Sequence, residues 1–369
     1  KAMQGVKRAA RRMIERFSGP RPFEPVDDRP LPEEVPPVIM DWPATTPKPL
    51  VGLVKDRDRP PYWTKYQRFL EKNEIPFHYY DPHTSNWASD AAEFDVIIWR
   101  VESPPTRIEE ARRKIYLLEL HANKICYPRY FTAQLYEDKI LQWELLRRLG
   151  YPAISTFYSA SYEETAKYFA SASYPLVSKI VTGSGSTGVT KISDRRAGLA
   201  MAKRVFSLQG LPTFWPYLRQ HGYVLLQPLE PNAGYDLRVL VIGSKVFGYY
   251  RYAPEGDFRA SGHSATRKEG LPADAMDVAR HIAQDLDQEM LAVDFLRRTD
   301  GSLGIIEMSA FVRVDTPRQL EVDGIPGAYQ LDERGDYVFE AGEAWPQELA
   351  LAEFFRRRWL GQGHERGPK

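Results

Sequence analysis

Two regions of this chain differ in the order of their predicted strands and helices, and this difference restricts how the chain can fold. Between residues 50 and 128, short apolar strand-like runs such as LVGLVKD and FDVIIWRV alternate with segments of helical spacing. Such an alternation predicts βαβ units and therefore a small parallel sheet covered by helices. Between residues 174 and 260, strand-like segments mostly follow one another, and a turn at Gly243 and Ser244 indicates an antiparallel hairpin. We therefore expect an α/β (α+β) protein in which a parallel domain precedes antiparallel sheets.

The same patterns suggest where the chain divides. A basic amphipathic segment and a proline-dense stretch, which resists regular structure, predict a helix and an extended linker or wrapping arm over residues 1–49. The parallel domain is expected over 50–130, a central unit over 131–225, and a C-terminal unit over 226–369. The basic helix could pack on the body or on a partner, make a peripheral membrane contact, or stay disordered, and these alternatives stay open.

Composition excludes several classes of function. Acidic and basic residues nearly cancel, with a formal net charge of +1, so no overall field points to nucleic acid as a partner. The only cysteine, Cys126, lies in an apolar run and cannot form an internal disulfide, which favours an inert thiol in a reducing cytoplasm. No apolar run reaches the roughly 20 residues that a bilayer-spanning helix needs. We expect a soluble, cytoplasmic protein.

A glycine-rich loop is the first candidate for binding chemistry. The segment SKIVTGSGSTGVTKIS, residues 178–193, has Gly183, Gly185 and Gly188 in the spacing of a dinucleotide-binding fingerprint. That fingerprint requires a helix after the last glycine to receive the phosphates, whereas the β-branched residues of VTKIS predict a strand. Two interpretations stay open: a glycine-rich cover over nucleotide phosphates, or a Gly/Ser turn without a ligand.

Two acids lie within otherwise apolar strand-like segments. AVDFLRRTDGSLGIIEMSA places Asp294 and Glu307 on consecutive strands, at similar distances from a turn at Asp300 and Gly301. Across a hairpin their carboxylates can meet on one face of the sheet. Mg²⁺ binds through one or two such carboxylates and leaves its other positions to water and phosphate. The alternative is a buried ion pair with arginine.

Together these stretches resemble the ATP-grasp family, in particular the carboxylate–amine ligases that include glutathione synthetase, D-alanine–D-alanine ligase and the enzymes that add glutamate to protein tails. The resemblance extends from about Leu50 to Val314. EDKILQWELLRRLGYPAIST is similar to the family's lysine-helix segment, and YPLVSKIVTGSGSTGVTKIS to its lysine strand, glycine loop and second strand. AGYDLRVLVIGSKVFGYYRYAPEGDFRASG is the most specific stretch. The resemblance implies an N-terminal parallel α/β domain followed by two α+β subdomains that sandwich ATP.

The resemblance also implies a nucleotide site. Lys139 and Lys179 would contact the phosphates, and LLQPLE would line the adenine pocket through Gln227, the Leu229 backbone and Glu230. The cover over the phosphates would consist of Gly183, Ser184, Gly185, Ser186 and Gly188.

The reacting groups follow from the same resemblance. Asp236 and Arg238 would lie beside the nucleotide or the acceptor, and Arg251, Arg259 and Lys179 would be the catalytic cations. The metal ligands for Mg²⁺ or Mn²⁺ would be Asp294, Glu307 and Ser309. The family usually has asparagine where this chain has Ser261 and Ser309, which predicts weakened or rearranged metal coordination.

The reaction implied by the resemblance forms an amide. ATP would phosphorylate a carboxylate to an acylphosphate, and an amine would then displace phosphate, with Arg251 as the candidate for stabilising the tetrahedral intermediate. The expected acceptor is a small molecule, an amino acid, or a glycan or peptide, and a homo-oligomer stays open. Two alternatives also stay open: an ATP-grasp phosphotransferase and a non-catalytic ATP-binding protein.

Overall fold

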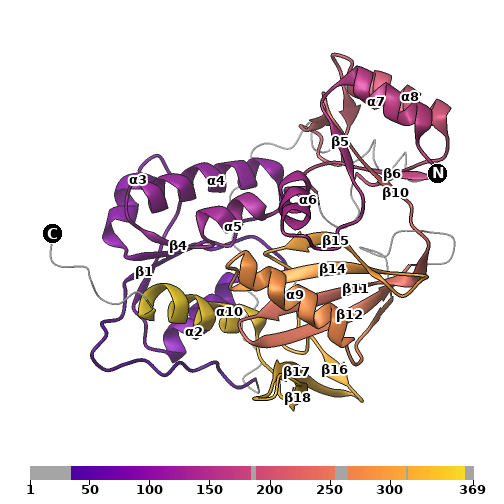
Figure 1. Ribbon diagram of the computed structural model, residues 1–369. Coiled ribbons are helices and arrows are strands. Elements are labelled where there is room, and N and C mark those ends of the chain that lie inside the picture. The colour runs from indigo at the N-terminus through magenta and orange to yellow at the C-terminus, as the bar shows by residue number, and fades with distance from the viewer. Residues whose placement is uncertain (1–34, 184–187, 254–264, 313–314, 362–369) are drawn as a thin grey trace.

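The computed structural model describes residues 35–183, 188–253, 265–312 and 315–361. In these ranges the chain forms a body of two sheets and a smaller lobe that stands apart from it at the upper right of Figure 1. The predicted basic helix, residues 1–17, lies outside the described residues. No helix in the described ranges is both long enough and apolar enough to span a membrane.

The first sheet is parallel, as predicted. It contains β1 (Val51–Leu53), β2 (Phe77–Tyr79), β3 (Val96–Ile98) and β4 (Ile125–Tyr127) in the order β2-β1-β3-β4. The connections carry α2 (Trp63–Lys72), α3 (Trp87–Asp90) with a 3₁₀ turn at Ala91–Glu93, and α4 (Pro105–Leu120), and α5 (Tyr130–Leu135) follows β4. β1 and β3 are buried along their whole length, as in sheets covered on both faces.

The lobe contains the second sheet, which is antiparallel. β5 (Phe157–Ser159), β10 (Val224–Pro228), β6 (Leu176–Lys179) and β7 (Thr190–Ile192) pair in that order, and α7 (Tyr162–Ser171) and α8 (Arg195–Val205) lie beside them (Figure 1). A short ribbon of β8 (Leu211–Pro212) and β9 (Arg219–Gln220) precedes β10. The strand expected after the glycines is confirmed as β7, so the glycine loop connects two antiparallel strands.

The third sheet is the largest and is antiparallel. Its order is β15-β14-β11-β12-β17-β16, with β13 paired to β12 and β18 to β17. The two predicted hairpins are present at Gly243–Ser244 and at Asp300–Gly301, and α9 (Ala273–Asp285) packs on β11 and β14. The strands of this third sheet are β11 (Asn232–Ile242), β12 (Lys245–Tyr252), β13 (Ala265–Arg267), β14 (Met290–Arg298), β15 (Leu303–Ser309), β16 (Glu321–Val322), β17 (Ile325–Leu331) and β18 (Tyr337–Ala341).

The two ends of the described chain meet on the first domain. α10 (Pro346–Phe355), which continues as a π-helical turn at Arg356–Leu360, packs against α2 as well as β11. The described part of the proline-rich arm lies along the same surface, where Trp42 contacts Phe355 at 5.9 Å between ring centroids. The last helix of the predicted unit 226–369 therefore packs against the predicted unit 50–130.

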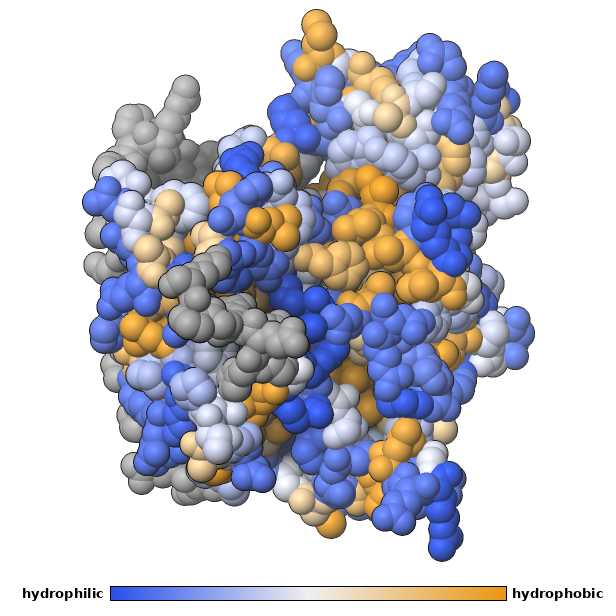
Figure 2. Space-filling view, turned by 60° about the vertical axis from the view of Figure 1, so that its left-hand side comes forward, coloured by the Kyte–Doolittle hydropathy of each residue, from blue (hydrophilic) through white to orange (hydrophobic). Residues whose placement is uncertain are grey.

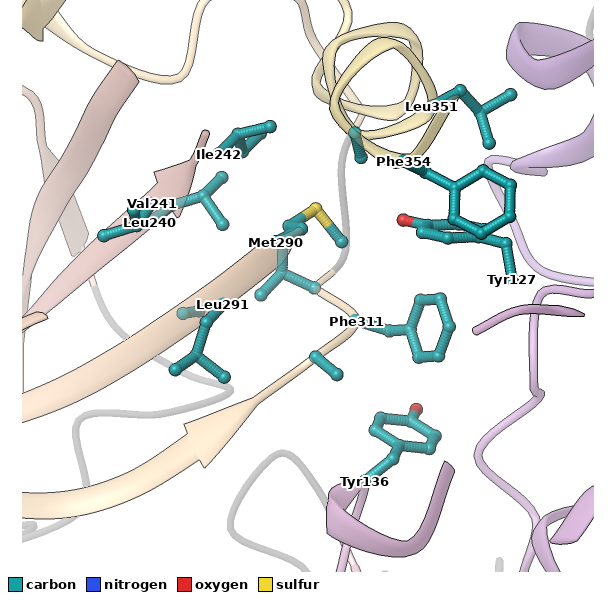
Figure 3. Close-up of a cluster of buried hydrophobic side chains, with 14 of the residues drawn as sticks. Tyr127, Tyr136, Leu240, Val241, Ile242, Met290, Leu291, Phe311, Leu351 and Phe354 are labelled. Carbon is teal, nitrogen blue, oxygen red and sulfur yellow. The ribbon is translucent and has the colours of Figure 1, made fainter. Parts of the chain in front are cut away.

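A single hydrophobic core joins the first and third sheets. Phe311, just after β15, has its ring centroid 5.2 Å from that of Tyr136 and 6.5 Å from that of Tyr127, which in turn contacts Phe354 (Figure 3). The lobe has a separate core built around Phe169, Leu176 and Leu226. In Figure 2 the lobe stands above the body, and a hydrophobic area lies on the body just below it.

Candidate functional site

A pocket lies between the lobe and the body. Its empty space amounts to about 340 Å³, part of which is open to solvent. β6 and β10 line it from the lobe, and α6 (Lys139–Arg148) and β15 line it from the body. The lining residues are Lys139, Gln142, Trp143, Leu146, Ala153, Thr156, Lys179, Leu225, Gln227, Ile305, Ile306 and Glu307. Apolar side chains thus surround a few polar groups, two of which are lysines.

One face of α6 supplies four of the lining side chains. Lys139, Gln142, Trp143 and Leu146 follow the i, i+3, i+4, i+7 spacing that places residues on the same side of a helix. The Asp138 side chain caps this helix by accepting from the N–H groups of Ile140 and Leu141. Gln142, Trp143 and Leu146 were not predicted as site residues, although their spacing from Lys139 was a signal in the sequence.

The two predicted phosphate lysines lie in the pocket but differ in their partners. Lys139 is 9 % exposed, and its Nζ pairs with Glu307 Oε1 at 3.0 Å and donates to the Gly183 carbonyl at 2.6 Å. Burial disfavours its charge, but Glu307 and Glu137 outweigh burial and raise the pKa of Lys139. Lys179 is 8 % exposed, and its ammonium has no hydrogen-bond or ion-pair partner in the part of the chain that the structure describes. Burial lowers its pKa to about 8.

The start of the glycine loop is attached to the segment that begins α6. Glu137 Oε2 accepts from the Gly183 N–H at 2.9 Å, and Tyr223 Oη accepts from the Val181 N–H at 3.1 Å. Gly183 has φ 155° and Gly188 φ 77°, values that favour glycine. A Cβ on Gly188 would also lie 2.6 Å from Ile180 Cδ1. Ser184, Gly185 and Ser186 lie outside the described residues, so their predicted role stays a prediction.

Asp294 lies in a buried network of arginines and acids on neighbouring strands. Both its oxygens accept from Arg238 at 2.7 Å, and Arg251 Nη2 lies 2.9 Å from Oδ2. Arg251 also pairs with Asp236. Burial favours a protonated Asp294, but the two arginines outweigh it and lower the pKa of this carboxyl. At Asp236, burial outweighs Arg251 and raises the pKa to about 6.

The predicted metal ligands are close together but already have other partners. Asp294 and Glu307 stand opposite each other on β14 and β15, as the hairpin predicted. However, Asp294 is bound by two arginines, Glu307 pairs with Lys139, and the Ser309 hydroxyl donates to the Phe311 carbonyl. Among the described residues no group of three or more His, Cys, Asp or Glu side chains could hold a metal ion. The arrangement at Asp294 includes the buried arginine pair that the sequence left open, and its role as a metal ligand stays a prediction.

The predicted adenine residues are only partly available to a base. Gln227 lines the pocket, and its amide donates to Thr156 Oγ1 at 2.9 Å. The Leu229 N–H already donates to the Pro175 carbonyl at 3.1 Å, and the Glu230 carboxylate accepts from Arg298 at 2.5 Å. Gln227 is therefore the predicted adenine residue that the pocket presents most directly. Arg259 and Ser261 lie outside the described residues.

Comparison with known proteins identifies similar domains. The model of the RimK-like ATP-grasp domain matches residues 136–324, which include α6, the glycine loop and the hairpin of Asp294 and Glu307. No curated protein sequence matches the chain.

Several solved structures share the fold at low sequence identity. The D-cycloserine synthetase DcsG superposes with a TM-score of 0.55 at 17 % identity, over 83 % of this chain and 99 % of its own. The ATP-grasp ligase PsnB, complexed with minimal precursor, Mg and ADP, gives 0.50 at 16 % identity over 72 % and 90 %. N5-carboxyaminoimidazole synthetase from Staphylococcus aureus gives 0.50 at 11 % identity over 74 % and 73 %. At these identities the likeness concerns the fold alone.

Proposed function

Because this chain belongs to the RimK-like ATP-grasp family, we propose that the pocket between β6 and β15 binds ATP and uses it to activate a carboxylate for attack by an amine. Family membership confirms the predicted family, the predicted ATP-grasp fold and the predicted class of enzyme, an ADP-forming carboxylate–amine ligase. The substrates and the residue roles below belong to the proposal.

The observation that carries the nucleotide assignment is Lys179. A buried ammonium without a partner is costly unless an anion joins it. Its pocket also contains Lys139 and a set of apolar side chains, which suit the phosphates and the base of one nucleotide. The described residues therefore fit ATP.

The proposed reaction has two steps. An oxygen of the substrate carboxylate attacks the γ-phosphorus of ATP, and ADP leaves. The amine nitrogen then attacks the acyl carbon of the acylphosphate, phosphate leaves with the electrons of the C–O bond, and the nitrogen gives up one proton to phosphate or water as the amide forms. Lys139 and Lys179 would neutralise charge on the phosphates, and Arg238 and Arg251, held in place by Asp294, would keep positive charge beside the transferred group.

The proposal takes no step through a metal ion, because the acids that would bind one have lysine and arginine partners. Mg²⁺ or Mn²⁺ stays a prediction, which a titration of the protein with Mn²⁺ in the presence of ADP would test. We also propose an acceptor that is a small molecule, an amino acid, or a glycan or peptide, since the names of the similar structures include a cycloserine synthetase and a ligase complexed with a precursor. A cytoplasmic location is proposed from Cys126, whose thiol is buried and has a raised pKa.

The test measures ADP and inorganic phosphate released with pairs of carboxylic acids and amines. Release of both products only when both substrates are present supports a ligase. ADP without phosphate, together with a phosphorylated acceptor, would instead indicate a phosphotransferase, and neither product a binding protein. Lys179→Met should abolish turnover, whereas Lys203→Met, which removes an exposed lysine on α8, should leave it unchanged.

A further inference from the structure

Glu137 is a buried acid to which neither the sequence motifs nor the reaction assigns a role. It follows α5 and precedes the capping residue Asp138, and it is 5 % exposed. Its φ of 58° lies in the left-handed region, where a residue other than glycine is strained. Contacts with neighbouring residues must stabilise a carboxylate that is both buried and strained. The contacts of Glu137 therefore indicate its role.

Those contacts are with two residues predicted to bind the phosphates, Gly183 and Lys139. Glu137 accepts from the Gly183 N–H at 2.9 Å, while Lys139 donates to the Gly183 carbonyl at 2.6 Å. Glu137, just before α6, and Lys139, its first residue, therefore bind the N–H and the carbonyl of Gly183. The Lys139 N–H also donates to the Val181 carbonyl at 3.4 Å, so this segment and the end of β6 form a continuous contact.

The charges around Glu137 point to the same role. Lys139 lies between two acids, because Glu307 pairs with it at 3.0 Å and Glu137 also acts on it electrostatically. Lys179 is the second buried lysine of the pocket. The negative charges of Glu307 and Glu137 keep the ammonium of Lys139 charged in a site of low dielectric, whereas Lys179 has no such partner among the described residues.

We propose that Glu137 is a positioning residue for the phosphate end of the nucleotide: its carboxylate holds the Gly183 peptide and, with Glu307, fixes the Lys139 ammonium. This inference rests on the proposed ATP pocket. Glu137 touches neither phosphate nor base directly, and it acts through Gly183 and Lys139. Its loss should therefore weaken the binding of phosphates and leave the binding of the nucleoside unchanged.

The experiment measures the dissociation constants of ADP and adenosine for the full chain. Glu137→Ala should weaken ADP binding about tenfold or more, the size expected for losing a charged hydrogen bond, and change adenosine binding by less than about twofold. Glu137→Gln keeps an acceptor for the Gly183 N–H but loses the charge beside Lys139, so it should recover part of the lost ADP affinity. Equal losses for ADP and adenosine, unchanged ADP binding, or no recovery in Glu137→Gln would overturn the proposal.

Glu119 provides a matched control. It is also a partly buried acid that accepts from a backbone N–H, that of Tyr130 at 2.7 Å, and burial raises its pKa, as it does for Glu137. It lies on α4, away from the pocket. Glu119→Ala should lower thermal stability without changing ADP affinity, and an ADP loss equal to that of Glu137→Ala would count against the proposal. If wild-type protein binds no ADP, the nucleotide assignment itself fails, which separates the two ideas.

Discussion

Asp294 and its two arginines show how strongly a single buried carboxylate can depend on its neighbours. Arg238 and Arg251 both pair with it, and among the described residues Asp236 is the second acid that pairs with Arg251. Removal of one partner from a buried ion pair typically costs about 3–5 kcal/mol, because the other charge is left uncompensated. Asp294 therefore stabilises the sheet whether or not a metal ever binds.

This interpretation predicts the behaviour of Asp294→Asn. The substitution keeps the shape but removes the charge, so we expect the free energy of unfolding in EDTA to fall by about 3 kcal/mol. Urea denaturation measures it, with Asp300→Asn, at the exposed turn of the same hairpin, as a control without effect. If Asp294→Asn costs stability only when Mg²⁺ is present, the acid is a metal ligand and the arginine pair is secondary.

If Lys179 binds the phosphates as proposed, its lowered pKa predicts that nucleotide affinity depends on pH. Its folded pKa of about 8 lies below the ordinary value of 10.5, so between these values the unfolded chain binds more protons than the folded one. Lys179 should therefore increase the free energy of unfolding as pH rises from about 8 to 10.5. Over the same range the ammonium loses its proton, and the remaining charges near it are Glu307, Lys139 and Asp294.

We accordingly expect ADP affinity to fall roughly tenfold between pH 7 and pH 9, since a group with pKa 8 keeps about a tenth of its protons at pH 9. Titrations at pH 7, 8 and 9 measure the slope. Lys179→Arg keeps its charge throughout this range and should remove most of the dependence. An equal slope in Lys179→Arg would show that another group is responsible.

At the scale of elements, local sequence predicted the hairpins but not what packs around them. The turn residues and the apolar runs were sufficient to place Asp294 opposite Glu307, because the pairing of a tight hairpin is set within about twenty residues. The partners of Asp294 come from β11 and β12, more than 40 positions earlier in the chain. Their register depends on tertiary packing, so the sequence could leave an arginine pair open but could not choose it.

The helix α6 shows a different kind of gap. Lys139 was predicted from a family motif, whereas Gln142, Trp143 and Leu146 needed only the helical period and the assumption that the face of Lys139 is the functional one. Glu137 had no such signal. It looks like any charged residue before a helix, and the role proposed for it rests on its contact with Gly183, 46 positions away.

At the scale of the whole molecule, the described residues form two hydrophobic cores with the candidate pocket between the lobe and the body. The larger core joins the first and third sheets with α10, and the lobe has a small core of its own. Two backbone hydrogen bonds join the segment that leads into the lobe to β15 of the body. Ile154 donates to the Ile305 carbonyl at 3.1 Å, and Ile305 donates to the Pro152 carbonyl at 2.8 Å. The return of α10 onto α2 was not predictable from periodicity, since it joins segments almost 300 residues apart.

Two cores predict two unfolding transitions, and the pocket predicts how they are coupled. Phe169 is fully buried in the lobe and Phe295 in the body. Phe169→Ala should therefore reduce the free energy of unfolding of the lobe, and Phe295→Ala that of the body, by about 3–5 kcal/mol each. Each variant should lower the midpoint temperature of a different calorimetric transition. ADP should raise the lobe transition in wild-type protein, because a ligand that contacts Lys179 and Gln227 binds only when the lobe is folded. A single transition that both variants lower equally would mean that the lobe and the body fold as one cooperative unit, despite their separate cores.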